Sequence, residues 1–422
     1  MDNDRMETQQ CPPRWVGLDW GESTHAVSVV DDRRTVVTRF TADATLEGLD
    51  ALAEQLGAVG PVAGIAIEAT SNLVVTFLLS KGFTLYLINP KMSKNWRESC
   101  SVAGAKSDAR DGLVLAVELA RRHESLRPVQ HSSDSVAELA GLCETLRKLV
   151  NERTKLLQCL KATLRQYFPA ALGFFTDWTS PAAWRFLNKF PRPQALAKAR
   201  KDTLCRFLKA NHIGLSPLWL ARIDQAREAA AWPCPQEALS LEVTALSLVA
   251  QLLALQPHID KCDRLIAERS EALPQAALIH SLPGTGKRLT PALTAITALV
   301  ADEEDRLEAL RCLSGVAPVE YSSGKRCSVH IRLRCNKHWR NVMHLYARVS
   351  IQHCAWARAF YDLCRERGDR YATALRKLAD KWIKIVNRML STQDLYDDAR
   401  YVEALRKGGS PVYARLCGKV SG

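Results

Sequence analysis

The sequence predicts a mixed α/β domain followed by a mainly helical remainder, and three observations support this fold class. Strand-like and helical patterns alternate over the first third of the 422 residues. Leucines recur at alternating spacings of three and four residues in the middle third, and the last third contains long amphipathic helical patterns. A chain of this length exceeds one ordinary domain, so we expect two or three.

The first third contains five strand-like segments and three helical segments. The strands are expected over residues 14–20, 24–30, 34–39, 62–67 and 83–88, and the helices over residues 45–56, 71–80 and 107–121. Asp31 and Asp32, between the second and third strands, are typical of a hairpin turn. The order β-β-β-α-β-α-β-α is that of the ribonuclease-H-like fold, which we expect over residues 14–128.

The region from residue 134 to residue 272 is expected to form long helices. A coiled-coil seam with two polar interruptions is formed by Leu139, Leu142, Leu146, Leu149, Arg153, Leu156, Leu160, Thr163 and Tyr167. A second long helix starts near Leu239, and we expect Pro257 to interrupt it. The two helices are expected to pair as an antiparallel hairpin or as a dimer seam. Between them, residues 170–235 are expected to form a compact, mostly helical insertion.

A mainly helical region is expected over residues 273–392, followed by a tail over residues 393–422 that matches no pattern. The region opens with LPGTGKRLTP, whose GTGK lacks the spacing of a nucleotide-binding phosphate loop. The pattern favours a helix-hairpin-helix-like turn, in which Gly284 and Gly286 let the backbone approach a phosphate beside Lys287. A tight turn between two helices that binds no ligand is the alternative.

The positive charge of the chain is concentrated in one block. The formal net charge is +13, and Tyr321–Leu390 alone holds 16 Lys/Arg and 4 Asp/Glu, a net of +12. Within this block Lys377, Lys381, Lys384 and Arg388 recur at helical spacing, opposite an apolar face. A localised basic surface of this kind favours a polyanionic partner, most often nucleic acid. A solvated helix face is the alternative.

The thiols and the apolar segments indicate a cytoplasmic protein. The 13 cysteines are odd in number and include no C-x-x-C pair, which is typical of reduced thiols. The N-terminal MDNDRMETQQCPP has no apolar run, so we expect no signal peptide. The most apolar long run, residues 238–255, carries Glu242 and Gln251 and is expected to be an amphipathic helix rather than a membrane span.

Four acidic residues in the first third form a candidate metal site. Asp19 and Glu68 end the first and fourth strands, and Asp108 and Asp111 are one helical turn apart in KSDARDG. In a ribonuclease-H-like sheet these positions converge. Four carboxylates placed together repel one another unless a cation neutralises them, and hard oxygen ligands select Mg²⁺ or Mn²⁺. For any one acid taken alone, an ordinary turn or helix-start role is the alternative.

A candidate nucleophile lies in the polar segment SSGKR. Ser322 and Ser323 precede Gly324, and Lys325 and Arg326 follow it. Nearby cations can stabilise a serine alkoxide and the charge that develops on phosphorus during attack. A solvated polar turn is the alternative on local pattern alone.

A zinc site is a further possibility in the same region. Cys327, His330, Cys335 and His338 supply four nitrogen and sulfur ligands. The four-residue gap between the two pairs is short for a zinc finger, so we do not favour this interpretation.

Six segments together resemble the bridge-RNA-guided insertion-sequence transposase (serine recombinase) family. VGLDWGESTHAVSVVD, AIEAT and KSDARDG resemble its RuvC-like DEDD domain. LPGTGK, LSGVAPVEYSSGK and IRLRCNKHWR resemble its transposase domain. The resemblance extends over residues 14–390, and the two halves in this order make it specific.

The resemblance implies a DNA recombinase with a composite active site. Its four metal-binding acids correspond to Asp19, Glu68, Asp108 and Asp111, and its catalytic serine to Ser323, which becomes linked to a DNA 5′-phosphate. A structured non-coding RNA pairs with donor and target DNA, and two dimers assemble as a tetramer. Phosphate contacts are expected from Lys325, Arg326, Lys337 and Arg340, and Asn336 belongs to the same nucleic-acid-binding motif.

Two alternative functions are open at this point. A RuvC-like structure-specific nuclease would use the acids to activate water and would form no covalent intermediate. A non-catalytic nucleic-acid-binding protein would need neither the metal nor the serine.

Overall fold

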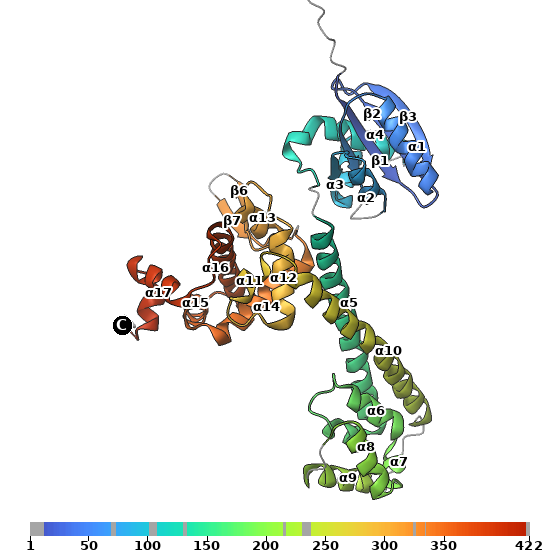
Figure 1. The fold of residues 1–422 in the computed structure, drawn as a ribbon, viewed down its shortest axis with the longest axis vertical. Helices are drawn as coiled ribbons and strands as arrows, with labels where there is room; N and C mark the ends of the chain where they lie inside the picture. Colours follow the sequence, from blue (N-terminus) through green and yellow to red (C-terminus); the bar gives the residue numbers. More distant parts are fainter. Residues whose placement is uncertain are drawn as a thin grey trace, which may run out of the picture. The chain divides into compact units, whose positions relative to one another are not determined.

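A computed structural model describes residues 12–68, 73–100, 108–129, 133–213, 217–229, 238–323, 326–333 and 335–418 (Figure 1). The chain divides into two compact units, residues 1–131 and residues 132–422. The mixed α/β sheet followed by a mainly helical remainder is confirmed. The finer ribonuclease-H-like and helix-hairpin-helix assignments stay predictions.

The first unit is built on a five-stranded sheet in the order β3-β2-β1-β4-β5. Its strands are β1 (Arg14–Trp20), β2 (Thr24–Val30), β3 (Val36–Asp43), β4 (Val62–Ile67) and β5 (Leu85–Leu87). The first three strands form an antiparallel meander, whereas β4 lies parallel to β1 and β5 lies parallel to β4. The carboxyl ends of β1 and β4 therefore meet at one edge of the sheet.

Helices cover both faces of this sheet (blue to cyan in Figure 1). They are α1 (Leu46–Ala58), α2 (Leu73–Ser80), α3 (Pro90–Cys100), α4 (Asp108–Arg122) and the short 3₁₀ helix η1 (His123–Ser125). Val16 and Leu18 of β1 pack in one core with α1 and α2, whereas Trp15 packs in a second core with α3 and α4. This alternation is the period of two expected of a strand buried on both faces.

Two details of the first unit differ from the sequence prediction. The third strand begins at Val36 rather than at residue 34, because Arg34 has φ 65° and its N–H donates to the Asp31 carbonyl at 2.8 Å in the turn. Helix α3 was not predicted. It is polar, and its buried side chains are only Ser93 and Trp96, so its apolar pattern is too sparse to stand out.

The second unit begins with two 34-residue helices, α5 (Asp134–Tyr167) and α10 (Ala238–Glu271). The Arg269–Glu138 ion pair at 2.8 Å and the Arg153–Gln256 hydrogen bond at 3.0 Å show that they pack antiparallel. Of the two expected arrangements, the chain therefore forms the hairpin with itself. Helix α10 is also long and apolar enough to cross a membrane, which is weak evidence by itself because core helices of soluble proteins pass the same test.

The predicted interruption at Pro257 is wrong, because α10 continues through that residue. Proline removes one backbone hydrogen bond and usually kinks or ends a helix. Here Leu252 and Ile259, on either side of Pro257, are fully buried in the packing of the unit. The local signal is therefore overridden by tertiary contacts.

Short helices fill the segment between α5 and α10. They are η2 (Pro169–Gly173), α6 (Pro181–Lys189), α7 (Pro193–Ala197), α8 (Lys201–Ala210) and α9 (Pro217–Ala229). Their core is aromatic: Phe186 lies 4.8 Å from Phe174 and 5.9 Å from Trp219 between ring centroids. Described residues of the segment thus form short helices around an aromatic core, and the bounds of the predicted insertion stay a prediction.

The rest of the second unit is helical apart from one hairpin. Its elements are α11 (Ala276–His280), α12 (Gly286–Ala298), α13 (Arg306–Leu313), β6 (Val319–Ser323), β7 (Arg326–His330), α14 (Lys337–His353), α15 (Ala355–Glu366), α16 (Tyr371–Thr392), α17 (Asp398–Lys407) and α18 (Pro411–Leu416). Fully buried Tyr346, Trp356 and Trp382 pack together in this core with their rings tilted, at centroid distances of 5.1 Å (Tyr346–Trp382) and 4.7 Å (Trp356–Trp382). The helices beyond residue 392 pack onto the same core through Tyr396 and Tyr401.

Candidate active site and nucleic-acid interface

Asp19 and Glu68 lie at the same edge of the sheet in the first unit. The last paired residues of β1 and β4 that precede them are Leu18 and Ile67, which are directly opposite each other. Asp19 and Glu68 each follow one residue later. The indole Nε1 of Trp20 donates to the Glu68 carbonyl at 3.0 Å and ties the two strand ends together.

Two glycines allow α4 to approach this edge of the sheet. A Cβ atom on Gly17 would lie 1.9 Å from the Gly112 carbonyl oxygen and 2.4 Å from the Ala116 nitrogen, so only glycine fits there. Asp111 directly precedes Gly112 in α4. Because side chains alternate along β1, Asp19 lies on the same face of the sheet as Gly17, and α4 covers this face. The close contact therefore brings the start of α4 towards the two strand ends.

Arg97 of α3 joins two of the predicted metal-binding acids. Its Nη1 lies 2.9 Å from Oδ2 of Asp111 and 3.6 Å from Oε2 of Glu68. The Asp111 side chain is only 5% exposed, so its charge requires a partner. Arg97 was not predicted from the sequence, because no motif marks it and its helix was not predicted.

The donor chemistry of this cluster fits a hard divalent cation. Glu68 and Asp111 present carboxylate oxygens around one positive group, and Asp19 lies at the adjoining strand end. Asp108 opens α4, and its side chain lies outside the described residues. Within the described part of the chain, no three acidic, histidine or cysteine side chains form a metal-binding group.

The predicted nucleophile lies at the end of the two-stranded hairpin in the second unit. Ser322 pairs with Cys327, and Ser323 pairs with Arg326, in the antiparallel register of β6 and β7. Gly324 and Lys325, between the strands, lie outside the described residues, as do the side chains of Ser323, Arg326 and Cys327. The backbone thus presents Ser323 and Arg326 as cross-strand neighbours at the hairpin tip.

Asn336 has a structural role in the first turn of α14. It is the N-cap of α14, where its Oδ1 accepts hydrogen bonds from the backbone nitrogens of His338 at 2.8 Å and Trp339 at 3.3 Å. Capping satisfies backbone donors that the first helical turn leaves open. An asparagine directly before a helical pattern is the sequence signal for this role. Lys337, at the first position of the helix, is exposed.

Arg340 is likewise occupied within the protein. Its Nη2 donates to the carbonyl oxygens of Arg332 at 3.2 Å and Leu333 at 3.3 Å, and its Nε lies 3.1 Å from the Cys335 sulfur. These contacts fix the loop between β7 and α14. In this arrangement the guanidinium of Arg340 stabilises the loop rather than extending towards a ligand.

The LPGTGK segment forms the turn between α11 and α12. Gly284 has φ 77°, and a Cβ atom there would lie 2.6 Å from the His353 ring, so this glycine packs against α14. Gly286 has φ 57° and faces open space, and Lys287 beside it is exposed. Packing thus accounts for Gly284, while Gly286 and Lys287 remain accessible.

The basic stripe of α16 divides into paired and unpaired cations. Lys377 contacts both carboxylate oxygens of Asp369, at 2.6 and 2.8 Å, and Lys384 lies 3.0 Å from Asp380. Among the described residues, Lys381 and Arg388 form no ion pair with a carboxylate. The opposite face of the helix, with Leu378 and Trp382, is fully buried.

The possible zinc ligands are not gathered. His338 is buried beside Trp339, with ring centroids 4.4 Å apart, whereas Cys335 contacts Arg340 and His330 Nε2 lies 3.0 Å from the Ser328 hydroxyl. Burial lowers the pKa of His338 to about 4. The side chain of the fourth residue, Cys327, lies outside the described residues.

Two family models match the chain. The DEDD transposase model for IS110, described as a transposase, matches residues 16–169, and the model described as "Transposase IS116/IS110/IS902 family" matches residues 276–362. The first match contains all four predicted acids. The second contains the LPGTGK turn, the serine hairpin and α14.

Curated relatives match along nearly their whole length. The chain is 28% identical to the mini-circle putative transposase for IS117 of Streptomyces coelicolor, over 91% of this chain and 95% of the relative. It is 28% identical to the uncharacterized 42 kDa protein of insertion element IS900 of Mycobacterium paratuberculosis, over 92% and 98%. A 44.8 kDa protein of insertion element IS116 of Streptomyces clavuligerus is 26% identical, over 91% and 96%.

Proposed function

Because this chain belongs to the IS116/IS110/IS902 family of transposases, we propose that it cuts and rejoins the DNA strands of an insertion sequence through a covalent serine intermediate. The observation that supports this proposal is the joint presence of two sites. One is an acid cluster that contains Glu68 and Asp111, and the other is a hairpin tip at which Ser323 and Arg326 are neighbours.

The acid cluster would hold a divalent cation, Mg²⁺ or Mn²⁺, through Asp19, Glu68, Asp108 and Asp111. Carboxylate oxygens are the ligands that these ions prefer. When bound, such an ion stabilises negative charge on the scissile phosphate. The four residues supply the ligands, and the contact between Gly17 and Gly112 positions the helix that carries Asp111.

Ser323 would act as the nucleophile. Its Oγ forms a bond to the phosphorus while the bond from phosphorus to the departing 3′-oxygen breaks. The hydroxyl proton leaves Oγ, and the departing strand end takes up a proton to become a 3′-hydroxyl. Arg326, opposite Ser323 in the hairpin register, and Lys325, its neighbour in the sequence, would stabilise the charge on the phosphate.

Phosphate contacts along the DNA or RNA would come from exposed cations of the second unit. Lys287, Lys337 and Arg388 are exposed, and half-buried Lys381 lines a cavity, so these four are available for this role. Asn336 and Arg340 would act indirectly, because their side chains hold α14 and the loop before it. Such contacts position the protein on a nucleic acid without reading its sequence.

Sequence recognition would be supplied by a structured guide RNA. Base pairing between this RNA and both the donor and the target DNA would determine the DNA sequences at which the protein acts. The basic surface would then need to contact only the phosphate backbone. The protein would act in the bacterial cytoplasm, at the nucleoid, as a tetramer of two dimers. These assignments extend the family membership and rest on the resemblance described above.

A covalent-adduct assay tests the proposal. The protein is incubated with its guide RNA, Mg²⁺ and end-labelled DNA, and adducts are resolved by denaturing electrophoresis. Ser323→Ala is expected to abolish the adduct, whereas Ser322→Ala is expected to retain it. An adduct that persists in Ser323→Ala contradicts the assignment of the nucleophile.

The same experiment distinguishes the alternative functions. Strand cleavage by the unmodified protein without any adduct indicates a nuclease that activates water. A non-catalytic nucleic-acid-binding protein gives no metal-dependent cleavage, and Asp19→Ala then leaves transposition in cells unchanged.

A further inference from the structure

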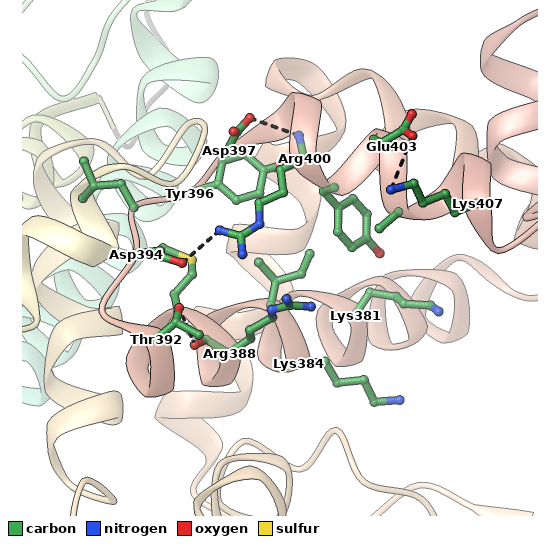
Figure 2. A pocket seen from close by; sticks show the side chains of 15 residues that line it. Lys381, Lys384, Arg388, Thr392, Asp394, Tyr396, Asp397, Arg400, Glu403 and Lys407 are labelled. Carbon is green, nitrogen blue, oxygen red and sulfur yellow. Dashed lines mark hydrogen bonds and ion pairs between the residues drawn. The ribbon is translucent and has the colours of Figure 1, made fainter.

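A cavity of about 510 Å³ lies between α16 and α17 (Figure 2). It is formed by residues 381–407, beyond the stretches that the two family models match. Pockets of several hundred Å³ are typical of small-molecule sites. The cavity can therefore admit a single small group, whereas a nucleic-acid duplex is too large to enter it.

Cations dominate the two sides of this cavity. They are Lys381, Lys384 and Arg388 on α16 and Arg400 and Lys407 on α17, all labelled or drawn in Figure 2. Three of these five cations already have acidic partners: Arg400 lies 2.9 Å from Asp394, Lys384 lies 3.0 Å from Asp380, and Lys407 lies 3.9 Å from Glu403.

The remaining two cations, Lys381 and Arg388, form no ion pair with a carboxylate among the described residues, and Arg388 also lies close enough to Asp394 to interact with it electrostatically. Lys381 lies over the Phe360 ring instead, 5.7 Å from its centroid. The lining holds five cations against three carboxylates, Asp394, Asp397 and Glu403, and this excess of positive charge attracts an anionic group such as a phosphate.

The inner part of the cavity is apolar and aromatic. Tyr401 packs on Trp356 with ring centroids 4.5 Å apart, and burial raises its pKa to about 12, so it is neutral and firmly held. Tyr396 is fixed by a 2.8 Å hydrogen bond from the Trp356 indole. Leu395, which also lines the cavity, is 61% exposed, so its apolar side chain is available to a ligand.

We propose that this cavity binds one unpaired nucleotide of a single-stranded nucleic acid. The phosphate would lie against Arg388 and Lys381, and the base would lie against Leu395 and Tyr401. Single-stranded nucleic acids are typically held by this combination of a basic rim and an apolar, aromatic surface. The inference deepens the proposed function, because it rests on nucleic acid being the substrate. It adds a site for a strand segment that is not base-paired.

The test uses the full-length protein and fluorescence anisotropy of labelled oligonucleotides. The probes are single-stranded oligo(dT), single-stranded oligo(U) and a blunt DNA duplex of the same length. Ala404→Trp fills the cavity without changing any charge. It is expected to weaken binding of at least one single-stranded probe by about fivefold or more and to leave duplex binding unchanged. The probe that loses affinity identifies the source as DNA or RNA.

Two further variants separate the cavity from the general basic surface. Arg388→Ala is expected to weaken single-strand binding, whereas Lys155→Ala, at an exposed lysine of α5 that pairs with Glu152, is expected to have no effect. Leu395→Ser removes the apolar contact at an exposed position without adding a larger side chain. It is also expected to weaken single-strand binding. Thermal melting verifies that each variant is folded.

Unchanged single-strand affinity in folded Ala404→Trp and Leu395→Ser overturns the proposal. Photocrosslinking of oligonucleotides that carry 5-iodouracil gives an independent measurement. Crosslinks are expected in residues 395–407, and crosslinks confined to other parts of the chain also overturn it. If no covalent adduct forms but the binding and crosslinking results are as expected, the proposed serine chemistry is contradicted and the proposed nucleotide site is not.

Discussion

The guanidinium of Arg97 lies 2.9 Å from the carboxylate of Asp111, which is one of the most deeply buried acidic groups in the described part of the chain. The same guanidinium lies 3.6 Å from Glu68. A buried carboxylate without a partner is costly, so Arg97 provides the positive charge that allows two acids to share one site. A divalent cation bound by the same acids would compete with Arg97 for this role.

Arg97→Ala is expected to make the stability of the protein dependent on metal. Loss of the guanidinium leaves Asp111 buried and unpaired, which lowers the free energy of unfolding by roughly 1–3 kcal/mol in the absence of metal. Mg²⁺ or Mn²⁺ restores much of this loss by neutralising the carboxylates. The measurement is thermal melting with and without metal, on the unmodified protein and the variant.

Two controls sharpen this experiment. Arg97→Lys keeps the charge and is expected to stay closer to the unmodified protein. Arg121→Ala removes an exposed arginine from the same unit and is expected to show no metal dependence. An equal metal-induced shift in Arg97→Ala and in the unmodified protein would contradict the role assigned to Arg97.

Gly17→Ala is expected to disturb the acid cluster from a distance. The added methyl group would lie 1.9 Å from the Gly112 carbonyl, so α4 must move away from β1. Overpacking of this kind costs roughly 1–3 kcal/mol. Gly57→Ala is the matched control, because a Cβ atom there meets nothing within 4 Å in helix α1. Urea denaturation should show a loss for Gly17→Ala and a small gain for Gly57→Ala; equal stabilities would refute the packing argument.

The sequence predicted the parts of the candidate site that depend on local pattern. The strand ends at Asp19 and Glu68 follow short apolar runs, and the helix of Asp111 has a strong amphipathic pattern. Arg97 was not predictable, because its role depends on contacts between α3, α4 and the end of β4. The cavity between α16 and α17 was also missed, since it arises only when two helices pack.

Some local signals pointed in the wrong direction or admitted two roles. Pro257 normally interrupts a helix, but the packing of α10 against α5 keeps the helix continuous. Asn336 was assigned to nucleic-acid binding by resemblance, and the structure gives its side chain a capping role. Whether such a residue has a local or a tertiary role depends on its neighbours in the folded chain, which the sequence alone does not show.

Acid pH is expected to destabilise the second unit through His338. Burial lowers the pKa of His338 to about 4, from an ordinary value of 6.5. Between these values the unfolded chain binds a proton that the folded protein excludes. Stability is therefore complete above pH 6.5 and falls as the pH drops towards 4, by about 2 kcal/mol between pH 7 and pH 5. Denaturation at both pH values measures this difference, and His338→Gln should reduce it. An identical pH dependence in the variant would exclude His338 as the cause.

The adjacent residues Asn336 and Lys337 are expected to differ in what their loss affects. Asn336→Ala removes the cap of α14 and should lower the free energy of unfolding by about 1 kcal/mol, with nucleic-acid affinity at moderate salt nearly unchanged. Lys337→Ala removes an exposed cation and should leave stability unchanged while weakening DNA binding. It should also reduce the slope of log affinity against log salt by about 1.

Asn336→Asp, which keeps a capping oxygen, is the control for the first variant. If Asn336→Asp and Asn336→Ala weaken binding equally while both remain stable, Asn336 contacts the nucleic acid directly and its assignment as a cap is insufficient.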